Sequence, residues 1–361
     1  MRLFVIVTPG LEPLALKEIE LKCPIQNPIV IKGGIEFEGN LEWVESAHLL
    51  LKIPTRILMR VTDFKVRDFP KLFQKLSKFE WNKFLSHPKP NWEISCSKSR
   101  LNHTGRIEET LNQALNEALV RQPLSKDWEK KSFPPQTFYV RLFEDQLTLS
   151  LDLTGEPLYK RGLQTIKGEA PLRENLAAAF IFKIFEGIDS SVTLVDPMCG
   201  SGTLLTEALT FMKPLKLRTF AFESAPFYKG KILKVPQEQS SLPINKCIGF
   251  DINEDLIKKI ETNLPIEFRI QNSLEQKIDE SNMVMICNPP YGERIKIQGK
   301  RGQFLQNAWK KYLADGPLRL GWLLPSDMDD LFKEHEKYHV REKIHLKNGG
   351  LAVTFWIWER N

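Results

Sequence analysis

The chain has 361 residues, 42% of them hydrophobic, and its 51 basic and 45 acidic residues give a formal net charge of +6. This length predicts two or three domains with real cores, and the modest positive charge suits a phosphate-rich partner without requiring one. No apolar run reaches the roughly 18 residues of a membrane helix and none at the start resembles a secretory signal, so we expect a cytoplasmic protein with no membrane partner.

Residues 1–55 show the pattern of a small α+β unit, in which strand-like and helix-like stretches alternate. Gly33 and Gly34 interrupt the second strand-like run. The predicted elements are strands over residues 2–8 and 28–37 and helices over residues 11–22 and 41–51.

The same alternation repeats on a larger scale over residues 56–157. We expect the dipeptide Glu144-Asp145 to form the hairpin turn between the last two strands of this unit. The predicted elements are strands over residues 56–64, 92–97, 137–143 and 146–153 and helices over residues 69–79 and 106–120.

Four basic side chains gather just before the second of these helices, namely Lys98, Arg100, His103 and Arg106. A helix N-terminus suits a phosphate group because its first N–H groups have no partner within the helix. On the residues alone, an ordinary solvated loop explains these positions as well as RNA contact does.

The pattern breaks at residues 154–157, and residues 158–168 look like a basic linker that contains Arg161. Residues 169–361 then alternate in the manner of a Rossmann-like, doubly wound α/β domain closed by a hairpin. The proline-rich span 213–245 is too long for a simple crossover and predicts an insertion. The expected elements are helices over residues 172–185, 203–212, 254–263 and 303–313 and strands over residues 192–195, 246–250, 266–270, 283–287, 319–324, 341–346 and 352–358.

A glycine loop follows the first strand of this domain. The strand ends in Asp196, the loop contains Gly200 and Gly202, and a helical pattern begins at Thr203. Glycines allow a turn with positive φ and let a ligand approach the backbone, next to the free N–H groups of the helix start. By itself such a loop is explained by turn geometry as readily as by a cofactor.

A second motif, Asn288-Pro289-Pro290-Tyr291, follows the strand over residues 283–287. Its prolines fix φ and remove backbone donors, so the loop is rigid and brings an amide, a carbonyl and an aromatic ring together. Ligands bind at this edge of an open α/β sheet. The pair of motifs therefore favours a ligand site over a plain proline turn.

The two motifs together resemble those of amino-group methyltransferases that use S-adenosylmethionine (SAM). The wider match resembles the bacterial THUMP-domain guanine-N2 RNA methyltransferases, in particular the 23S rRNA m2G family, across nearly the whole chain. It includes F-V-I-V-T-P-G-L-E-P-L-A-L-K-E-I near the start, L-Y-K-R-G-L from Leu158, A-P-L-R-E-N-L-A from Ala170 and Gly292-Glu293-Arg294.

This resemblance implies a fold and a partner. It implies a ferredoxin-like unit at 1–55, a THUMP-like RNA-binding domain at 56–157, a linker at 158–168 and a SAM-dependent methyltransferase domain at 169–361. The partner implied is RNA, with 23S rRNA favoured over tRNA. The RNA-binding candidates are Lys98, Arg100, His103, Arg106 and Arg161.

The cofactor site would be built around Asp251, which ends the next strand. Its carboxylate suits both ribose hydroxyls of a nucleoside, although it could instead cap the following helix. Asp196 would orient the glycine loop or approach the methionine end of SAM. The further cofactor candidates are Pro197, Cys199, Gly200, Ser201, Gly202 and Thr203 in the loop, Ile252 against the adenine, and Asn272 or Ser273 near the adenine amino group.

The catalytic candidates are Asn288, Pro289, Pro290 and Tyr291. The Asn288 side-chain oxygen and the Pro289 carbonyl would accept the hydrogens of the target amine, and Tyr291 would stack on a flipped base. Catalysis would then consist mostly of positioning. The rivals are a DNA adenine-N6 or cytosine-N4 methyltransferase, a tRNA methyltransferase, and a non-catalytic RNA-binding protein. A Rossmann dehydrogenase is disfavoured because G-x-G-x-x-G is missing.

The five cysteines are scattered over positions 23, 96, 199, 247 and 287 without a C-x-x-C pair. An odd, scattered set argues against a disulfide framework and against a zinc site, so we expect reduced thiols and no metal. Cys199 and Cys287 lie beside the two motifs, where we expect them to pack rather than to act as nucleophiles.

Overall fold

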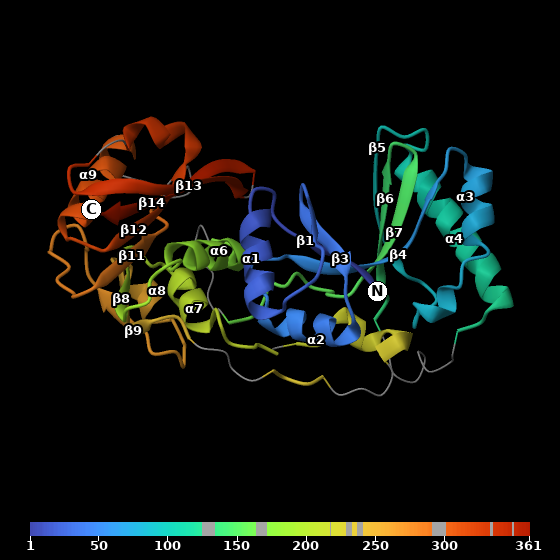
Figure 1. The fold of residues 1–361 in the computed structure, drawn as a ribbon, viewed down its shortest axis with the longest axis horizontal. Helices are drawn as coiled ribbons and strands as arrows, with labels where there is room; N and C mark the ends of the chain where they lie inside the picture. Colours follow the sequence, from blue (N-terminus) through green and yellow to red (C-terminus); the bar gives the residue numbers. More distant parts are fainter. Residues whose placement is uncertain are drawn as a thin grey trace.

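The computed structural model describes residues 1–124, 134–163, 172–216, 218–228, 233–236, 241–290, 301–332, 335–348 and 350–361. These residues form two seven-stranded sheets, one in each half of the chain, and the molecule is elongated with the two sheets toward opposite ends (Figure 1). No helix in these ranges is both long and apolar enough to cross a membrane.

The N-terminal sheet has the strand order β2-β3-β1-β4-β7-β6-β5, and it is antiparallel except for the parallel pair β5 and β6. The pairing of β1 with β4 joins the units expected at 1–55 and 56–157 into one continuous sheet. Its strands are β1 (Arg2–Ile6), β2 (Ile29–Ile31), β3 (Gly34–Glu38), β4 (Arg56–Lys65), β5 (Asn91–Ser97), β6 (Thr137–Phe143) and β7 (Gln146–Asp152).

The helices of this half lie beside its two parts. Helices α1 (Glu12–Lys22) and α2 (Leu41–Leu50) accompany the β1 part, and α3 (Phe69–Leu76) and α4 (Thr104–Arg121) pack together beside the β4–β7 part (Figure 1). Asn40 caps α2 and Asp68 caps α3, each by accepting a backbone N–H bond. The turn Glu144-Asp145 has positive φ at both residues, as a two-residue hairpin loop requires.

The C-terminal sheet has the order β10-β9-β8-β11-β12-β14-β13. Its first five strands are parallel and the hairpin β13–β14 adds antiparallel to β12, which confirms the doubly wound, Rossmann-like fold closed by a hairpin. The strands are β8 (Val192–Asp196), β9 (Ile244–Asp251), β10 (Glu267–Ile270), β11 (Met283–Cys287), β12 (Arg319–Pro325), β13 (Tyr338–Asn348) and β14 (Leu351–Arg360).

Four α-helices accompany this sheet in the described ranges: α6 (Glu174–Ile184), α7 (Thr203–Thr210), α8 (Glu254–Ile257) and α9 (Arg301–Ala314). The helix expected over residues 254–263 is wrong in its length, because it ends after one turn at Ile257. The N–H groups of Lys259 and Ile260 bond three residues back rather than four, so the chain tightens and leaves the α-helical path.

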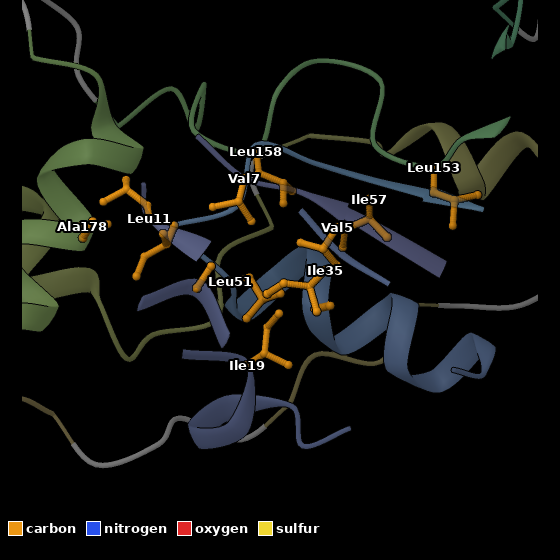
Figure 2. Close-up of a cluster of buried hydrophobic side chains, with 14 of the residues drawn as sticks. Val5, Val7, Leu11, Ile19, Ile35, Leu51, Ile57, Leu153, Leu158 and Ala178 are labelled. Atoms are coloured by element: carbon orange, nitrogen blue, oxygen red, sulfur yellow. The ribbon is translucent and has the colours of Figure 1, made fainter. Parts of the chain in front are cut away.

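The two halves share one hydrophobic cluster. Figure 2 shows Val5 of β1, Ile57 of β4, Leu158 of the linker and Ala178 of α6 as members of this cluster, and all four are buried. Since each half contributes to the same core, the N-terminal units are packed onto the methyltransferase-like domain rather than tethered to it.

The segment after α7 strengthens this connection. The N–H group of Leu215 donates to the carbonyl of Leu49 at 3.0 Å, and that of Phe222 donates to the carbonyl of Leu153 at 2.9 Å. Leu215 and Phe222, both within the span predicted as an insertion, therefore lie against the N-terminal half. Short 3-10 helices lie at η1 (Trp81–Lys83), η2 (Ala221–Ser224), η3 (Pro226–Tyr228) and η4 (Ser326–Leu331).

Candidate active site

The two motifs meet at the point where the C-terminal sheet reverses its strand order. β8 pairs in parallel with β9 on one side and with β11 on the other. The chain continues from β8 to β9 and β10 on the first side and then crosses to β11 and β12 on the second. Val195 lies opposite both Ile248 and Met285 in these two pairs. The carboxyl ends of the three strands therefore lie at one edge, where open α/β sheets bind ligands.

The glycine loop after β8 is held by its own backbone and by its neighbour β9. The Cys199 N–H donates to the Phe250 carbonyl at 2.8 Å, and the Gly200 N–H donates to Asp251 Oδ2 at 2.9 Å. Gly200 and Gly202 have φ of +54° and +77°, a region that favours glycine. A Cβ added at Gly200 would meet no atom within 4 Å, so open space lies beside this part of the loop.

Asp251 fixes the glycine loop and does not cap the next helix. Its second oxygen, Oδ1, accepts the N–H of Asn253 at 2.8 Å. The cap of α8 is Asn253, whose Oδ1 accepts the N–H of Leu256 at 3.0 Å. The capping alternative for Asp251 is therefore wrong, and its carboxylate connects the glycine loop to the Asn253 N–H. The neighbouring residue Ile252 is 74% exposed.

Asp196 is the buried carboxyl group of the site, with 1% of the residue exposed. Burial raises its pKa to about 8; the N–H of Met198, which donates to Oδ1 at 3.1 Å, lowers the pKa, and the charge of Asp251 raises it. The side chain thus performs the loop-orienting role. It would also accept a proton near neutral pH unless a cation lay beside it.

The adenine candidates Asn272 and Ser273 already have hydrogen-bond partners. The Ser273 hydroxyl donates to the Pro197 carbonyl at 2.7 Å and lies 2.7 Å from the Tyr312 hydroxyl. The expected contact of the Ser273 side chain with the adenine is therefore corrected. The side chain is buried and connects the loops that follow β8 and β10 instead. Asn272 Oδ1 accepts the Leu274 N–H at 3.1 Å, which makes its side chain part of the same turn.

Tyr312 is a supporting residue that the sequence reasoning missed. It lies on α9, is fully buried, and the pKa of its hydroxyl is raised by burial. Its bond to Ser273 connects α9 to the loop that follows β10. In the sequence it was one apolar-face residue of a predicted helix, and no motif marked it.

The second motif presents a polar atom without a partner. The Asn288 side-chain oxygen Oδ1 is buried and accepts no hydrogen bond from any residue in the described ranges. Leaving such an acceptor unpaired costs about 1–3 kcal/mol, so sites of this kind are usually completed by a ligand or water. Pro289 is buried beside it. Tyr291 and the following Gly292-Glu293-Arg294 lie outside the described residues.

The thiols beside the motifs are poor nucleophiles. Cys199 and Cys287 are both buried, and burial followed by the charge of Asp196 raises the pKa of each thiol. All five cysteines are free. Within the described ranges, no group of three His, Cys, Asp or Glu side chains could hold a metal ion.

Lys98, Arg100, His103 and Arg106 lie between the end of β5 and the first turn of α4. Both elements belong to the N-terminal half, at the end of the molecule opposite to β8, β9 and β11 (Figure 1). All four residues are exposed. His103 caps α4 by accepting the N–H of Arg106 at 3.2 Å, and the Arg106 guanidinium lies 4.2 Å from the centre of the Phe69 ring. Lys98 and Arg100 flank the β6–β7 hairpin, where the Arg100 N–H donates to Asp145.

Arg161 does not belong with these residues. Only 8% of it is exposed, one guanidinium nitrogen donates to Glu207 Oε2, and another donates to the Leu158 carbonyl at 3.2 Å. The expected contact of Arg161 with RNA is therefore corrected. Its side chain faces the junction between the two halves and pairs with the Glu207 carboxylate of α7.

Solved structures with the same fold cover the whole chain. A methyltransferase complexed with S-adenosylhomocysteine (SAH) is 24% identical, with a TM-score of 0.81, and the match covers 100% of this chain and 98% of that one. A predicted N6-adenine-specific DNA methylase from Listeria monocytogenes is 22% identical, with a TM-score of 0.80 and coverage of 100% and 96%. TrmN from Thermus thermophilus follows at 16% identity, a TM-score of 0.66 and coverage of 100% and 99%.

Curated relatives are similar over most of this chain. Ribosomal RNA large subunit methyltransferase K/L of Psychromonas ingrahamii is 32% identical over 316 residues, which cover 81% of this chain and 41% of the relative. The protein of the same name from Buchnera aphidicola is 29% identical over 325 residues, which cover 82% and 46%. The chain thus spans less than half the length of these relatives.

A family model described as RMKL-like, methyltransferase domain, matches residues 161–350. This match covers more than half of the chain and includes the glycine loop, Asp251 and the Asn288 motif, which the structure places at one sheet edge. The chain therefore belongs to the family of RMKL-like methyltransferase domains.

Proposed function

We propose that this protein transfers a methyl group from SAM to the exocyclic N2 amine of a guanine in RNA. The relatives named large-subunit ribosomal RNA methyltransferases support RNA, and 23S rRNA over tRNA, as the substrate. The observation that carries the proposal is Asn288 Oδ1, which is buried at the edge where β8, β9 and β11 end and has no partner among the described residues.

The residues at this edge fit SAM. Open space lies beside Gly200, the Asp251 carboxylate can accept ribose hydroxyls in addition to its two N–H bonds, and the exposed Ile252 can cover an adenine face. The charge of a sulfonium would favour the ionised form of Asp196. When bound, SAM supplies an electrophilic methyl group whose departure leaves a neutral thioether.

The chain's own part in the reaction is to hold the amine. Asn288 Oδ1 accepts one hydrogen of the amine and the Pro289 carbonyl accepts the other, so the nitrogen lone pair is withdrawn from the ring and directed to the methyl group. The rigid prolines keep both acceptors in place. A general base is not needed to start the reaction, because the proton can leave after transfer.

The same acceptor discriminates between sites on guanine. Ring nitrogen N7 carries no hydrogen and is itself an acceptor, so it would leave Asn288 Oδ1 unpaired, whereas N2 donates. Adenine N6 and cytosine N4 also donate, which is why a DNA amino-methyltransferase remains the second candidate. The N-terminal sheet with its exposed basic residues supports RNA.

The test is to identify the product. The purified protein is incubated with labelled SAM and with rRNA or tRNA from a strain that lacks it, and the methylated nucleoside is identified by mass spectrometry. We expect N2-methylguanosine in 23S rRNA. Methylated adenosine or cytidine, or 7-methylguanosine, would reject the guanine-N2 assignment, and the same nucleoside in tRNA alone would reject the rRNA.

A further inference from the structure

A small cavity lies at the junction of the two halves. It is formed by the end of α2, the linker around Leu158 and the segment that follows α7, and it is about 20 Å³ in volume and partly open. Its lining combines leucines and Phe220 with four nitrogen-bearing side chains, namely His48, Lys52, Arg161 and Arg218. A water molecule needs about 10–15 Å³, so the cavity admits only one or two oxygen atoms at a time.

The charges around this cavity do not balance. Lys22 Nζ pairs with Glu18 Oε1 at 2.6 Å, and Arg161 pairs with Glu207. All four of these residues are buried. Lys52 is a third buried cation, with 1% exposed, and its Nζ has no hydrogen-bond or ion-pair partner in the part of the chain that the structure describes.

The two carboxylates cannot readily serve Lys52 as well. Both Glu18 oxygens accept backbone N–H bonds, from Lys52 at 2.9 Å and Ile53 at 3.0 Å, in addition to the Lys22 ion pair. Burial, and then the charges of Arg161 and Lys22, lower the pKa of Lys52; Glu207 and Glu18 raise it by less. An unpaired buried ammonium is costly, so this arrangement calls for an anion or a neutral amine.

Further donors line the cavity. Arg161 Nε is buried and has no partner among the described residues, although the other two nitrogens of that guanidinium are bonded. Arg218 is half-buried and donates to the Pro157 carbonyl at 3.0 Å. His48 stays neutral, since burial lowers its pKa to about 3, and its Nδ1 lies 2.7 Å from the Val44 carbonyl.

We propose that this junction cavity binds a phosphate group, held by Lys52 Nζ and Arg161 Nε with Arg218 at the open side. The cavity is too small for a nucleoside, so the ligand is inorganic phosphate or the terminal phosphate of an RNA, whose oxygens enter while the rest stays outside. The donors belong to the N-terminal half, the linker and the segment after α7. A bound phosphate would therefore connect these three segments, at a place separate from the sheet edge where β8, β9 and β11 end.

The experiment compares wild-type protein with Lys52→Met in equilibrium dialysis against labelled inorganic phosphate. Methionine has a similar length and no charge, so this variant should fold and should unfold at a higher temperature than the wild type in phosphate-free buffer. We expect phosphate to bind the wild type at millimolar concentrations or below and to bind the variant at least about tenfold more weakly, as expected for losing a charged hydrogen bond. Lys258→Met, an exposed change directly after α8, is the matched control and should bind like the wild type.

A second arm separates the sources of the phosphate. A short RNA with a 5′-phosphate is compared with the same RNA carrying a 5′-hydroxyl. Tighter binding of the 5′-phosphorylated RNA than of the 5′-hydroxyl RNA, with the difference lost in Lys52→Met, assigns the site to an RNA end. Equal binding of the two RNAs, together with Lys52-dependent binding of inorganic phosphate, assigns it to the free ion. Equal phosphate affinity in Lys52→Met and wild type, or no binding of either probe, would overturn the proposal.

Discussion

The two loops at the methyltransferase edge differ in how their polar groups are used. In the glycine loop the N–H groups of Met198, Cys199 and Gly200 already donate to Asp196, Phe250 and Asp251. In the second loop two prolines bring no N–H group, and Asn288 Oδ1 is buried without a partner in the described ranges. The backbone of the glycine loop is therefore already fixed before the cofactor binds. The second loop instead holds an acceptor whose hydrogen bond we expect a substrate to provide.

The largest effect should come from removing that acceptor. Asn288→Ala should lower single-turnover methyl transfer by about a hundredfold or more, as expected for losing one preorganised catalytic hydrogen bond. SAM affinity and the unfolding temperature should change little, because Oδ1 bonds no other described residue. The measurement is transfer of labelled methyl to RNA at saturating SAM.

Two further variants sharpen this result. Asn307→Ala removes an exposed amide from α9 and should keep the wild-type rate. Asn288→Asp keeps an acceptor and should retain more activity than Asn288→Ala. A wild-type rate in Asn288→Ala would show that the chemistry lies elsewhere.

The glycine loop should respond in affinity rather than in rate. Asp251→Ala removes the acceptor of the Gly200 and Asn253 N–H groups together with the proposed ribose acceptor. We expect SAM to bind roughly 10–100-fold more weakly, a loss of a few kcal/mol at most. Calorimetric titration with SAM gives the affinity, and Asp255→Ala, an acidic residue on α8, is the control. Unchanged affinity in Asp251→Ala would disprove the ribose assignment.

Asp196 should make the stability of the ligand-free protein depend on pH. Its pKa in the folded state, about 8, is above the value near 3.8 of an exposed aspartate. The folded state therefore disfavours the carboxylate, and this loss of stability grows as the pH rises from about 4 to 8. Asp196→Asn keeps an acceptor for Met198 and cannot ionise.

Thermal unfolding of both proteins between pH 5 and 8 measures this effect. We expect the unfolding temperature of Asp196→Asn to exceed that of the wild type by a margin that increases with pH. At the upper end this margin corresponds to a difference in the free energy of unfolding on the order of a few kcal/mol. Saturating SAM should reduce the margin, because a cation near Asp196 favours its carboxylate. A margin that is constant over the range would contradict the raised pKa.

Local patterns predicted most strands of both sheets, because alternating or continuous apolar residues mark each of these segments. The run over residues 28–37, predicted as one strand, is instead the antiparallel pair β2 and β3. β11 was predicted to the residue, and β6 likewise. The one-turn helix α8 was predicted too long, because its apolar spacing continues to Ile260 while the N–H groups of Lys259 and Ile260 bond three residues back rather than four. The pairing of β1 with β4 had no signal in either segment, because strand partners far apart in sequence leave no local pattern.

In the site, the motifs located Asp196, the glycines, Asp251 and Asn288, and the structure brings their strand ends together. What the sequence could not give were partners made by tertiary contact. Arg161 read as a solvated basic residue, yet its carboxylate partner Glu207 lies on a distant helix. The burial of Lys52 could not be predicted either, because a single lysine after an apolar run is usually exposed.

The smallest expected effect concerns the basic residues around the start of α4, which differ from both loops in being exposed on the surface. We propose that Lys98, Arg100, His103 and Arg106 contact RNA phosphates, so each charge should act through counterion release rather than through a shaped site.

Arg106→Ala should weaken RNA binding by a few-fold at low salt and reduce the slope of log affinity against log salt by somewhat less than 1. Because the Arg106 side chain lies over Phe69 and only its N–H serves the α4 cap, the variant should fold normally. Filter binding over a range of salt concentrations measures the slope, with Lys258→Ala, directly after α8 in the other half of the chain, as the control. An unchanged slope in Arg106→Ala, or an equal decrease in both variants, would show that this loop is only a solvated surface.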